Sequence, residues 1–371
     1  MVQKEYKICK RCIMDTSDPE IIFDNEGYCN HCNTAIELAK TSWFPNDEGE
    51  KKLIGIIKKI KSENKGEDYD CVLGLSGGVD SSFMAYQAVK YGLKPLIVHV
   101  DCGWNSELAV KNIENIVKLL NLELHTHVVD WEEMKNLQIA FLKANVPNQD
   151  IPQDHAIFAG LYKFAVDNNV KYVLNGSNFA TECILPLSWG YNALDCKHLK
   201  SINKKFGKTK LKRFPYVTFF KRYIYYTFIK KMTIIKMLNY IPYSKEKAIE
   251  IMSNEIGWRY YGSKHHESRF TKFFQTYYLP VKFGYNKKRA HLSSLIVSGF
   301  MTRDKALEDM AKVDYTETEL NDDVEYVAKK LDMTKEQLIQ MINQPNKTYK
   351  DYPSNENLFK LGFKIRDFFK L

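Results

Sequence analysis

A short turn rich in glycine and serine carries the most recognisable chemistry of the sequence. An apolar run begins at Cys71 and stops at Ser76, and it is followed by Gly77, Gly78 and a segment, 83–89, with a helical pattern. Glycines let the backbone curl so that several N–H groups converge, and the start of a helix adds its partial positive charge. A strand, a glycine turn and a helix start in this order predict a phosphate-binding turn, with an ordinary strand-to-helix connection as the plain alternative.

The polar side chains of this turn suit a phosphate chain accompanied by a metal ion. Ser76, Ser81 and Ser82 carry hydroxyl groups that can donate hydrogen bonds to phosphate oxygens. Asp80 would repel bare phosphate, so we expect it to act through a bound Mg²⁺. The spacing is not that of the Walker A motif, and the stretch contains no G-x-G-x-x-G. The residues expected to hold pyrophosphate and Mg²⁺ are Ser76, Gly77, Gly78, Asp80, Ser81 and Ser82.

Half of the eight cysteines form two C-x-x-C pairs with 16 residues between them. Each pair suits one thiolate knuckle, and two knuckles complete a tetrahedral site for Zn²⁺. The predicted ligands are Cys9, Cys12, Cys29 and Cys32. With thiolates at every position the site would be structural, and the small N-terminal unit would depend on the metal for its fold. An Fe–S cluster and disulfides are the alternatives, and a cytosolic setting disfavours the disulfides.

A second polar cluster lies within residues 245–312, where lysines, arginines and histidines are interspersed with aromatic residues. This composition suits a pocket better than a plain helix face. Cations in a desolvated site could neutralise pyrophosphate as it leaves, which is worth several kcal/mol. The candidates for contacts with substrate or pyrophosphate are Lys264, Glu267, Arg269, Lys287 and Arg289, with ordinary surface charge as the alternative for each.

The elements that would position these residues alternate along the chain. Apolar runs predict strands near 71–75, 95–101, 124–130 and 171–178, and helical periodicity predicts helices over 83–89, 108–120 and 155–168. Strands alternating with helices indicate a doubly wound α/β fold, in which helices cover both faces of a parallel sheet. Ligands of such sheets bind at the carboxyl ends of the strands. Those ends carry the Ser76 turn, Asp101, Asp130 and the run Asn175, Gly176 and Ser177, with strand capping as the alternative for both aspartates.

These patterns divide the chain into three regions. Residues 1–45 are expected to form a ribbon-like zinc-binding unit, residues 46–196 the α/β domain, and residues 197–371 a largely helical region that binds substrate or partners. The first residues lack the apolar core of a signal peptide, and no run approaches the ~18 apolar residues of a membrane-spanning helix. With 44% hydrophobic and 27% charged residues, the composition is that of a soluble globular protein, so we expect a cytoplasmic location.

The positive charge is concentrated in one segment. Between Lys197 and Lys236 lie 13 lysines and arginines and no acidic residue, more than the net charge of +9 of the whole chain. Aromatic residues are interleaved with these cations, a composition that can bind nucleic acid, an acidic membrane surface or an anionic nucleotide-linked substrate. A helical insertion with a solvated lysine face is the other interpretation, and nucleic acid is the partner we expect least.

The stretch Ser-Gly-Gly-Val-Asp-Ser-Ser that begins at Ser76 resembles the PP-loop of the N-type ATP pyrophosphatases. The resemblance implies that ATP binds here through its β- and γ-phosphates, is cleaved between its α- and β-phosphates, and adenylates a carbonyl-type oxygen. In that superfamily the end of the second strand contacts the adenosine, and a later strand ends in a glycine turn near the α-phosphate. The resemblance thus places Asp101, Asn175, Gly176 and Ser177 near the adenosine and the α-phosphate.

A narrower resemblance depends on several motifs together. They are Cys-Lys-Arg-Cys-Ile-Met-Asp-Thr from Cys9, the PP-loop, Trp-Arg-Tyr-Tyr-Gly-x-Lys-His-His-Glu-Ser-Arg from Trp258 and Gly-Tyr-x-Lys-Lys-Arg-x-His from Gly284. In combination they resemble the N-acetyl sugar amidotransferases, which serve the synthesis of bacterial O-antigen and flagellar glycans. The resemblance covers most of the chain and is weak over 200–245 and in the C-terminal tail.

This second resemblance implies a reaction, its cofactors and its partners. ATP with Mg²⁺ would adenylate the N-acetyl group of a nucleotide-linked sugar, and ammonia would then displace the activated oxygen, giving an acetamidino group, AMP and pyrophosphate. Zn²⁺ would be held by the N-terminal unit. A separate glutaminase subunit and a barrel-shaped partner, similar to the imidazole glycerol phosphate synthase pair, would deliver the ammonia, because the chain shows no glutaminase nucleophile of its own.

Two other functions stay open at this point. A tRNA-thiolating enzyme can combine N-terminal zinc with a PP-loop and would explain the basic segment, but such enzymes usually need a catalytic cysteine pair. Cys183 and Cys196 are the candidates, and their spacing fits no known pair. The other possibility is a non-catalytic zinc-ribbon binding module with a decayed ATP site, and the intact Ser-Gly-Gly-x-Asp-Ser argues against it.

Overall fold

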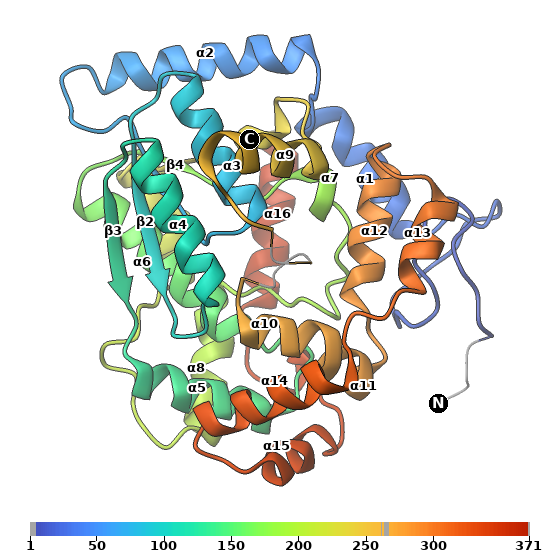
Figure 1. Ribbon diagram of the computed structural model, residues 1–371. Coiled ribbons are helices and arrows are strands. Elements are labelled where there is room, and N and C mark those ends of the chain that lie inside the picture. Colours follow the sequence, from blue (N-terminus) through green and yellow to red (C-terminus); the bar gives the residue numbers. More distant parts are fainter. Residues whose placement is uncertain (1–4, 261, 263–266, 370–371) are drawn as a thin grey trace.

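A parallel β-sheet forms the centre of the molecule (Figure 1). The computed structural model describes residues 5–260, 262 and 267–369, and within them five strands lie in the order β3-β2-β1-β4-β5. Every neighbouring pair is parallel, which confirms the doubly wound α/β fold expected from the alternating pattern. The strands are β1 (Cys71–Gly74), β2 (Pro95–Asp101), β3 (Leu124–Val128), β4 (Tyr172–Leu174) and β5 (Thr233–Ile235).

β1 lies in the middle of the sheet and is apolar on both faces because helices cover both. Val72 pairs with Leu96 of β2 and with Val173 of β4, and all three side chains are buried. Parallel pairing brings the carboxyl ends of β1, β2 and β4 to the same edge of the sheet. The glycine turn after β1 therefore lies between the ends of its two neighbours.

One face of the sheet is covered by α3 and α4, and α9 packs against both. Their apolar sides share a buried cluster with β1 that also includes Leu53 and Ile57 of α2. Side chains cap the first turn of three of these helices, those of Asn46, Ser106 and Ser244, as expected for N-terminal caps. The helices are α2 (Asp47–Glu63), α3 (Val79–Lys90), α4 (Glu107–Leu119) and α9 (Lys245–Ile256).

The opposite face is covered by α6, which contacts β1, β2 and β4, while α5 and α8 pack against α6. The sequence pattern had predicted α6 but not α5. Asp130 caps α5 by accepting a hydrogen bond from the Glu133 N–H at 3.0 Å, so this strand-end aspartate serves as a helix cap. The helices are α5 (Trp131–Ala144), α6 (Ile151–Asp167) and α8 (Cys196–Phe206).

The N-terminal unit contains less β-structure than a ribbon would. Two isolated bridges, Ile8 with Asp15 and Phe23 with Cys29, take the place of the expected hairpin among the described residues of this unit. The second cysteine pair lies at the start of α1 (Asn30–Ser42), which packs against α12. Figure 1 shows this unit beside α12 and α13, at the opposite side of the molecule from β3.

The C-terminal region is largely helical, as expected. A π-helical segment, η3 (Phe274–Tyr278), joins α10 to α11, and capping boxes at Thr316 and Thr334 start α14 and α15. Figure 1 shows α14 and α15 at the end of the molecule opposite α2. The helices are α10 (Arg269–Phe273), α11 (Leu279–Phe283), α12 (Lys287–Val297), α13 (Arg303–Met310), α14 (Glu317–Lys330), α15 (Lys335–Ile342) and α16 (Glu356–Phe369).

The basic segment between Lys197 and Lys236 contributes to the core more than its charge suggests. It supplies most of α8, a π-helix, η1 (Lys221–Ile229), and the edge strand β5. The sheet thus takes one strand from the region that was expected to be helical, and three residues are too few for a sequence pattern to reveal.

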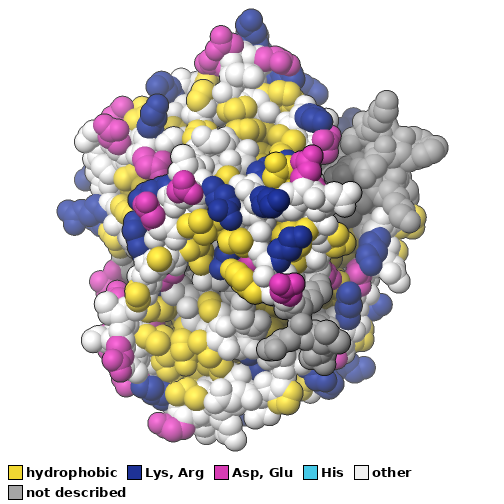
Figure 2. Space-filling model, turned by 90° about the vertical axis from the view of Figure 1, so that its right-hand side faces the viewer, with side chains coloured by type: hydrophobic (Ala, Val, Ile, Leu, Met, Phe, Trp, Pro, Cys, Tyr) yellow, Lys and Arg dark blue, Asp and Glu magenta, His cyan; other side chains and the backbone are white. Residues whose placement is uncertain are grey.

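Lysine and arginine side chains are interspersed with acidic ones on the face shown in Figure 2. Within the described ranges, no helix combines the length and apolar character required to cross a bilayer.

Candidate active site

The turn after β1 has a backbone that only glycine accommodates. Gly77 adopts φ +78°, in the left-handed region that other residues disfavour. A Cβ at this position would lie 2.5 Å from the carbonyl oxygen of Ala109 in α4, closer than real contacts allow. The Trp258 indole N–H donates to the Gly77 carbonyl at 3.3 Å, which holds the turn against the α9 side. The curled backbone predicted from the sequence is therefore present and tightly enclosed.

Helix α3 begins directly after this turn without a side-chain cap. Gly78 occupies the N-cap position, and because glycine has no side chain, the N-cap residue gives no side-chain hydrogen bond to the first turn of the helix. Ser76 and Ser81 face each other across the turn with their Oγ atoms 3.1 Å apart, and the Gly78 N–H donates to Ser76 Oγ at 3.2 Å. A helix start whose N-cap residue is glycine, flanked by hydroxyl groups, is a site suited to an anion.

A cavity of about 550 Å³ opens at this turn, within the range of small-molecule sites. Apolar side chains from β2 and α6, among them Val98, Val100, Ile157 and Phe158, form one part of its lining, and the polar ends of β1 and β4 form another. An apolar wall beside an anion site fits a nucleotide, whose base is apolar on its faces and whose phosphates are charged. We call this cavity the PP-loop pocket.

Most of the predicted residues lie in this pocket. Its lining includes Ser76, Gly78, Asp80, Ser81, Asn175, Gly176, Ser177, Glu267 and Lys287. Gly176 is held against the start of α3, since a Cβ there would lie 3.1 Å from the Ser81 nitrogen. Gly77 shapes the turn without lining the cavity. Ser82 is buried, and its Oγ has no hydrogen-bond partner among the described residues.

Several carboxylates line the pocket. Asp80 accepts a short hydrogen bond from the Tyr243 hydroxyl, which fixes the orientation of this carboxylate. Glu267 lies at the turn itself, since a Cβ on Gly78 would be 2.8 Å from Glu267 Oε1. The further acidic residues of the lining are Asp150, Asp154 and Glu182. Carboxylate oxygens beside a phosphate site are the ligands that Mg²⁺ prefers, so the donor set fits this ion.

Asp101 reaches the pocket through a neighbour. Its carboxylate accepts hydrogen bonds from the Gly103 N–H at 2.7 Å and from Asn105 Nδ2 at 3.1 Å. Asn105 Nδ2 also lies 3.0 Å from His99 Nε2, and His99 Nδ1 lies 2.8 Å from the Leu75 carbonyl oxygen. The carbonyl requires the proton on Nδ1, and Nε2 then accepts from the amide. Asn105 and His99 line the pocket, whereas Asp101 orients Asn105.

The two predicted arginines have settings that differ from the expected substrate contacts. The Arg269 guanidinium pairs with Asp323 at 2.5 Å and stacks over the Tyr326 ring. Arg289 donates to the Ile13 carbonyl at 2.7 Å and pairs with Asp15 at 3.1 Å. Neither arginine is among the residues lining the cavity. Lys264, the remaining candidate, lies outside the described residues.

Other pocket residues were not identified in the sequence. Gln153 and Asp154 come from the first turns of α6, Lys245 from the start of α9, and Gln275 and His291 from the C-terminal helices. The polar run from Asp150 to His155 around Pro152 is a signal that could have been noticed, because it precedes an apolar helix that follows a strand. The others carry no local signal, since only the topology brings them to the sheet edge.

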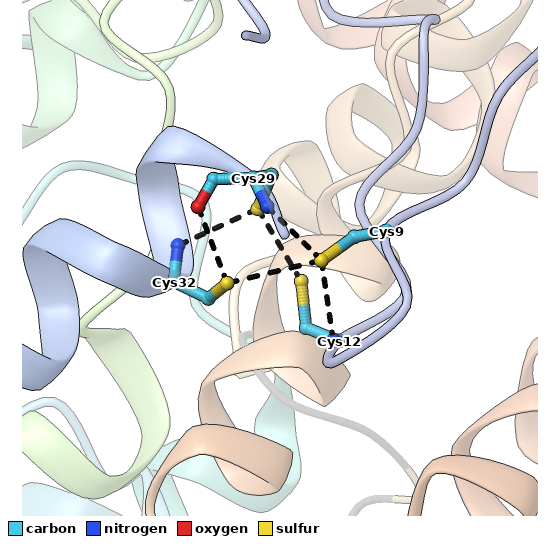
Figure 3. Close-up of side chains that lie close together, drawn as sticks. All are labelled: Cys9, Cys12, Cys29 and Cys32. Carbon is cyan, nitrogen blue, oxygen red and sulfur yellow. Dashed lines mark hydrogen bonds between the residues drawn. The ribbon is translucent and has the colours of Figure 1, made fainter. Parts of the chain in front are cut away.

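The cysteine pairs converge on one point, as Figure 3 shows. Cys9 and Cys32 sulfurs are 3.8 Å apart, Cys12 and Cys29 sulfurs are 3.6 Å apart, and all four ligand atoms lie within 4.8 Å of one another. Four sulfurs at about 2.3 Å from one Zn²⁺ are separated by about 3.8 Å in a tetrahedron. Backbone N–H groups of Arg11 and Cys12 lie 3.4 and 3.5 Å from Cys9 Sγ, as suits a thiolate knuckle. The buried set therefore fits zinc.

The cysteine unit is tied to the C-terminal helices. Arg303 of α13 donates through Nε to the Cys12 carbonyl at 3.1 Å and through Nη2 to the Cys9 carbonyl at 3.1 Å. The Ile13 N–H donates to Ser293 Oγ of α12 at 3.3 Å. Ala290 of α12 and Phe179 of α7 (Phe179–Glu182) pack in the same apolar cluster as the cysteines. The cysteine unit therefore packs against α7 and α12, two helices that also contribute residues to the lining of the pocket.

Comparison with solved structures gives partial matches at low identity. An NMN synthetase from Francisella tularensis is 21% identical, with TM-score 0.24, over 36% of this chain and 55% of that one, so the chain spans little more than half of its length. An NH3-dependent NAD synthetase from Campylobacter jejuni is 19% identical, with TM-score 0.28, over 43% and 72%. A predicted subunit of a tRNA methyltransferase from Methanocaldococcus jannaschii is 15% identical, with TM-score 0.29, over 50% and 75%.

The comparison with protein families is more specific. No curated protein matches the sequence. Residues 267–366 match the family described as LPS biosynthesis protein WbpG-like, C-terminal domain. This segment begins at Glu267 in the PP-loop pocket and includes α12, whose Lys287 and His291 also line it. Residues 267–366 are therefore similar to the WbpG-like C-terminal domain, and this match fits the N-acetyl sugar amidotransferase family that the motifs of the chain resemble.

Proposed function

We propose that the protein is the synthetase subunit of an ATP-dependent amidotransferase that converts the N-acetyl group of a nucleotide-linked sugar into an acetamidino group. The observation that carries the proposal is the enclosed glycine turn at Gly77, which joins β1 to the start of α3 at the edge of a nucleotide-sized pocket. The WbpG-like match supports a role in lipopolysaccharide or related glycan synthesis. We propose the cytoplasm as the location, where ATP and reduced thiols are available.

The chemistry follows from the poor leaving ability of an amide oxygen. The N-acetyl oxygen attacks the α-phosphorus of ATP, and the bond from that phosphorus to the bridging oxygen breaks, so pyrophosphate leaves. Ammonia then adds to the activated carbon. The carbon–oxygen bond breaks and AMP departs with the former amide oxygen. The sugar product is released with its acetamidino group as a cation, which keeps two of the three ammonia protons. The third proton goes to the pyrophosphate.

Several polar groups of the pocket have a role in this reaction. The first N–H groups of α3 with Ser76 and Ser81 would bind the β- and γ-phosphates. Asp80, oriented by Tyr243, would hold Mg²⁺, which neutralises the leaving pyrophosphate. Asn175 and Gly176 would lie near the α-phosphate, because they follow β4, and Gly176 lies beside the start of α3. His99 and Asn105 would contact the ribose or the base from the end of β2.

Thiolation of tRNA is the weaker alternative on chemical grounds. It usually requires a pair of reactive thiols near ATP. Cys102 lines the pocket, but burial raises the pKa of its thiol, and neither Cys183 nor Cys196 is among the lining residues. Burial raises the pKa of the Cys183 thiol to about 11 and also raises the pKa of Cys196. Thiols with raised pKa values are poor nucleophiles near neutral pH. We propose instead that ammonia is the nucleophile, delivered by a glutaminase subunit and a barrel-shaped partner.

The test uses isotopes to follow both transferred atoms. The full chain is incubated with ATP, Mg²⁺, ammonium labelled with ¹⁵N, and nucleotide-linked sugars whose N-acetyl oxygen is ¹⁸O. The expected result is ¹⁵N in the sugar and ¹⁸O in the phosphate of AMP. Added ammonium makes the glutaminase partner unnecessary. Formation of ADP, or AMP without ¹⁸O, would overturn the proposal, and AMP formed only with tRNA would favour thiolation.

A variant links the activity to the pocket. Asp80→Asn keeps the shape of the side chain and removes the charge that would hold Mg²⁺, so we expect AMP formation to fall about 100-fold or more. Asp332→Asn is the matched control, because Asp332 is a surface residue paired with Lys135 and lies outside the pocket lining. If both variants retained full activity, Asp80 would have no part in the reaction.

A further inference from the structure

A second cavity adjoins the PP-loop pocket. It has a volume of about 500 Å³ and shares the side chains of Thr181, Lys245, Gln275, Lys287 and His291 with the first. We call it the annex and define it by Lys245, Gln275, Lys287, Lys288, His291 and Lys312. A molecule in the annex would be separated from ATP only by these shared side chains. The pair of cavities therefore has room for two ligands that meet at one wall.

The annex runs along the N-terminal half of α12, whose charge pattern is unusual. The first turn of this helix contains Lys287, Lys288 and Arg289 and no acidic residue. Helix starts carry partial positive charge and favour acidic side chains, so three cations there repel the helix dipole. A bound anion would reverse this penalty. Asn286 accepts from the Lys288 N–H at 3.0 Å and fixes the direction in which the helix starts.

Lys287 is the second, independent sign of an anion site. Lys287 is only 8% exposed, and it lines both cavities. Its Nζ lies 5.0 Å from the centre of the Phe274 ring, and no carboxylate among the described residues lies within 4.0 Å of it. Burying an ammonium group without a partner charge is costly. A lysine kept in this position is best explained by an anionic ligand.

The other lysines of the annex show that Lys287 differs from them. Lys288 pairs with Asp314 at 2.7 Å and Lys312 pairs with Asp309 at 2.5 Å. Lys245 Nζ lies 3.0 Å from the Tyr260 hydroxyl. The first two lysines therefore have carboxylate partners within the protein, whereas Lys287 has none among the described residues. The ligand charge is expected next to Lys287 and the first turn of α12.

We propose that the annex binds the diphosphate of the nucleotide-linked sugar, between Lys287 and the start of α12, so that the sugar projects across the shared wall toward ATP. This inference depends on the proposed function for the identity of the substrate, but the anion site itself does not. A diphosphate supplies the negative partner charge that Lys287 lacks. The sugar attached to it would lie on the side of His291 and Gln275, which line both cavities. In-line displacement of pyrophosphate would require the N-acetyl oxygen to approach the α-phosphate from the opposite side.

The test separates the annex from the PP-loop by filling the latter. The full chain is saturated with the magnesium complex of α,β-methylene-ATP, which cannot be cleaved at the reacting bond, and is then titrated with UDP, GDP, dTDP or inorganic pyrophosphate. We expect one further site that prefers a nucleoside diphosphate. Lys287→Met should weaken that site about 10- to 100-fold, the loss of a charged hydrogen bond, and Lys287→Arg should restore part of it.

Lys305→Met is the matched control for Lys287→Met. Lys305→Met removes the same charge from α13, where Lys305 is exposed and pairs with Glu308, and it should leave binding unchanged. Near-ultraviolet circular dichroism of each variant checks the fold. Absence of a second site, or an equal loss in Lys287→Met and Lys305→Met, would overturn the inference. Preference for inorganic pyrophosphate would overturn it too, since the annex would then be an exit for product.

Steady-state kinetics separate two hypotheses, that the annex binds the sugar nucleotide and that the protein forms the acetamidino group. If the annex is the sugar-nucleotide site, Lys287→Met raises KM for the sugar nucleotide and leaves KM for ATP nearly unchanged. Diphosphate binding that depends on Lys287, without any AMP from a nucleotide sugar and ammonium, would leave the annex in place and reject the amidation. AMP formation with an unchanged sugar KM in Lys287→Met would reject the annex and leave the amidation.

Discussion

The zinc-binding unit and the PP-loop pocket are assembled over very different lengths of chain. All four thiols lie within residues 9–32, and two copies of one short spacing bring them together. The pocket takes its lining from segments between Gly74 and His291, which meet only after the sheet and helices have formed. Local spacing is therefore sufficient to define the first site, whereas the second site depends on the whole fold.

The two regions nevertheless share α12. Arg289 on this helix bonds to Ile13 and Asp15 of the N-terminal unit, while Lys287 and His291 line the pocket. Because the unit and the pocket contact the same helix, a change in the metal site is expected to reach the ATP site. We therefore expect the zinc-binding unit to support the PP-loop pocket through α12.

Loss of the metal should have the largest effect. Structural zinc contributes about 10–16 kcal/mol of apparent binding free energy in small metal units, and Cys29→Ser removes one of four ligands. We expect the variant to lose zinc, to unfold at lower temperature and to form AMP at least about 10-fold more slowly, because α12 loses its support. Zinc content, thermal unfolding and AMP formation are the measurements.

Cys183→Ser is the control for this change. Cys183 is a half-buried thiol outside the metal set, with its Sγ 3.9 Å from the Ser294 carbonyl, so zinc content should not change. If Cys29→Ser lost zinc and kept full activity and stability, the two regions would be independent and the proposed direction of support would be wrong.

The second-largest effect is expected at the turn of the pocket. Gly77→Ala forces a Cβ to 2.5 Å from the Ala109 carbonyl oxygen at a φ of +78°, so the turn must move. A shift approaching 1 Å at a reacting group can cost about 100-fold in rate, and we expect a loss of this size in AMP formation. Zinc content should stay the same, because the metal site is local.

Gly92→Ala separates backbone strain from displacement of the pocket. Gly92 has a φ of +76°, and its nearest neighbour is the flexible end of Lys61 at 3.3 Å. Both variants should lose about 1–2 kcal/mol of unfolding free energy from the left-handed backbone. Equal losses of AMP formation in the two would show that the enclosure of Gly77 by α4 does not matter.

The same difference explains how far the sequence could predict the structure. The cysteine set, the glycine turn and the strand–helix alternation are local patterns, and the structure contains them where they were expected. Asn105 and His99 were missed because the chemistry of β2 was assigned to Asp101, which orients Asn105. β5 was missed because three residues do not make a periodic signal. Spatial neighbours far apart in sequence leave no local trace.

Arg289 shows the limit of composition most clearly. Its place among lysines and histidines predicted a contact with substrate or pyrophosphate. The same contact was predicted for Lys287, for which it remains a prediction. The guanidinium instead bonds to the Ile13 carbonyl and to Asp15. Arg289 lies two residues after Lys287 in the same helix. Because successive helical residues are rotated by about 100°, the two side chains point to different parts of the surface. The sequence identified the segment and could not assign the direction.

The smallest effect is expected from cutting the link between the two regions. Arg289→Met removes the ion pair with Asp15 and the hydrogen bond to Ile13 while zinc remains bound. We expect α12 to lose part of its alignment, so that KM for the sugar nucleotide rises about 3- to 10-fold, the equivalent of one hydrogen bond. KM for ATP should change little, because the PP-loop is held by α4 and Trp258.

A double-mutant cycle with Asp15→Asn decides whether Arg289 acts through Asp15. Asp15 is buried in the N-terminal unit and also accepts from Tyr6 and Ser17, so it is separated from the pocket by α12. If Arg289 is a positioning residue, the two single variants raise the sugar KM by similar factors and the double variant adds little, since both remove one interaction. A loss above 100-fold in Arg289→Met with a harmless Asp15→Asn would instead place the guanidinium on the substrate, and the local site would then have no part in shaping the distributed one.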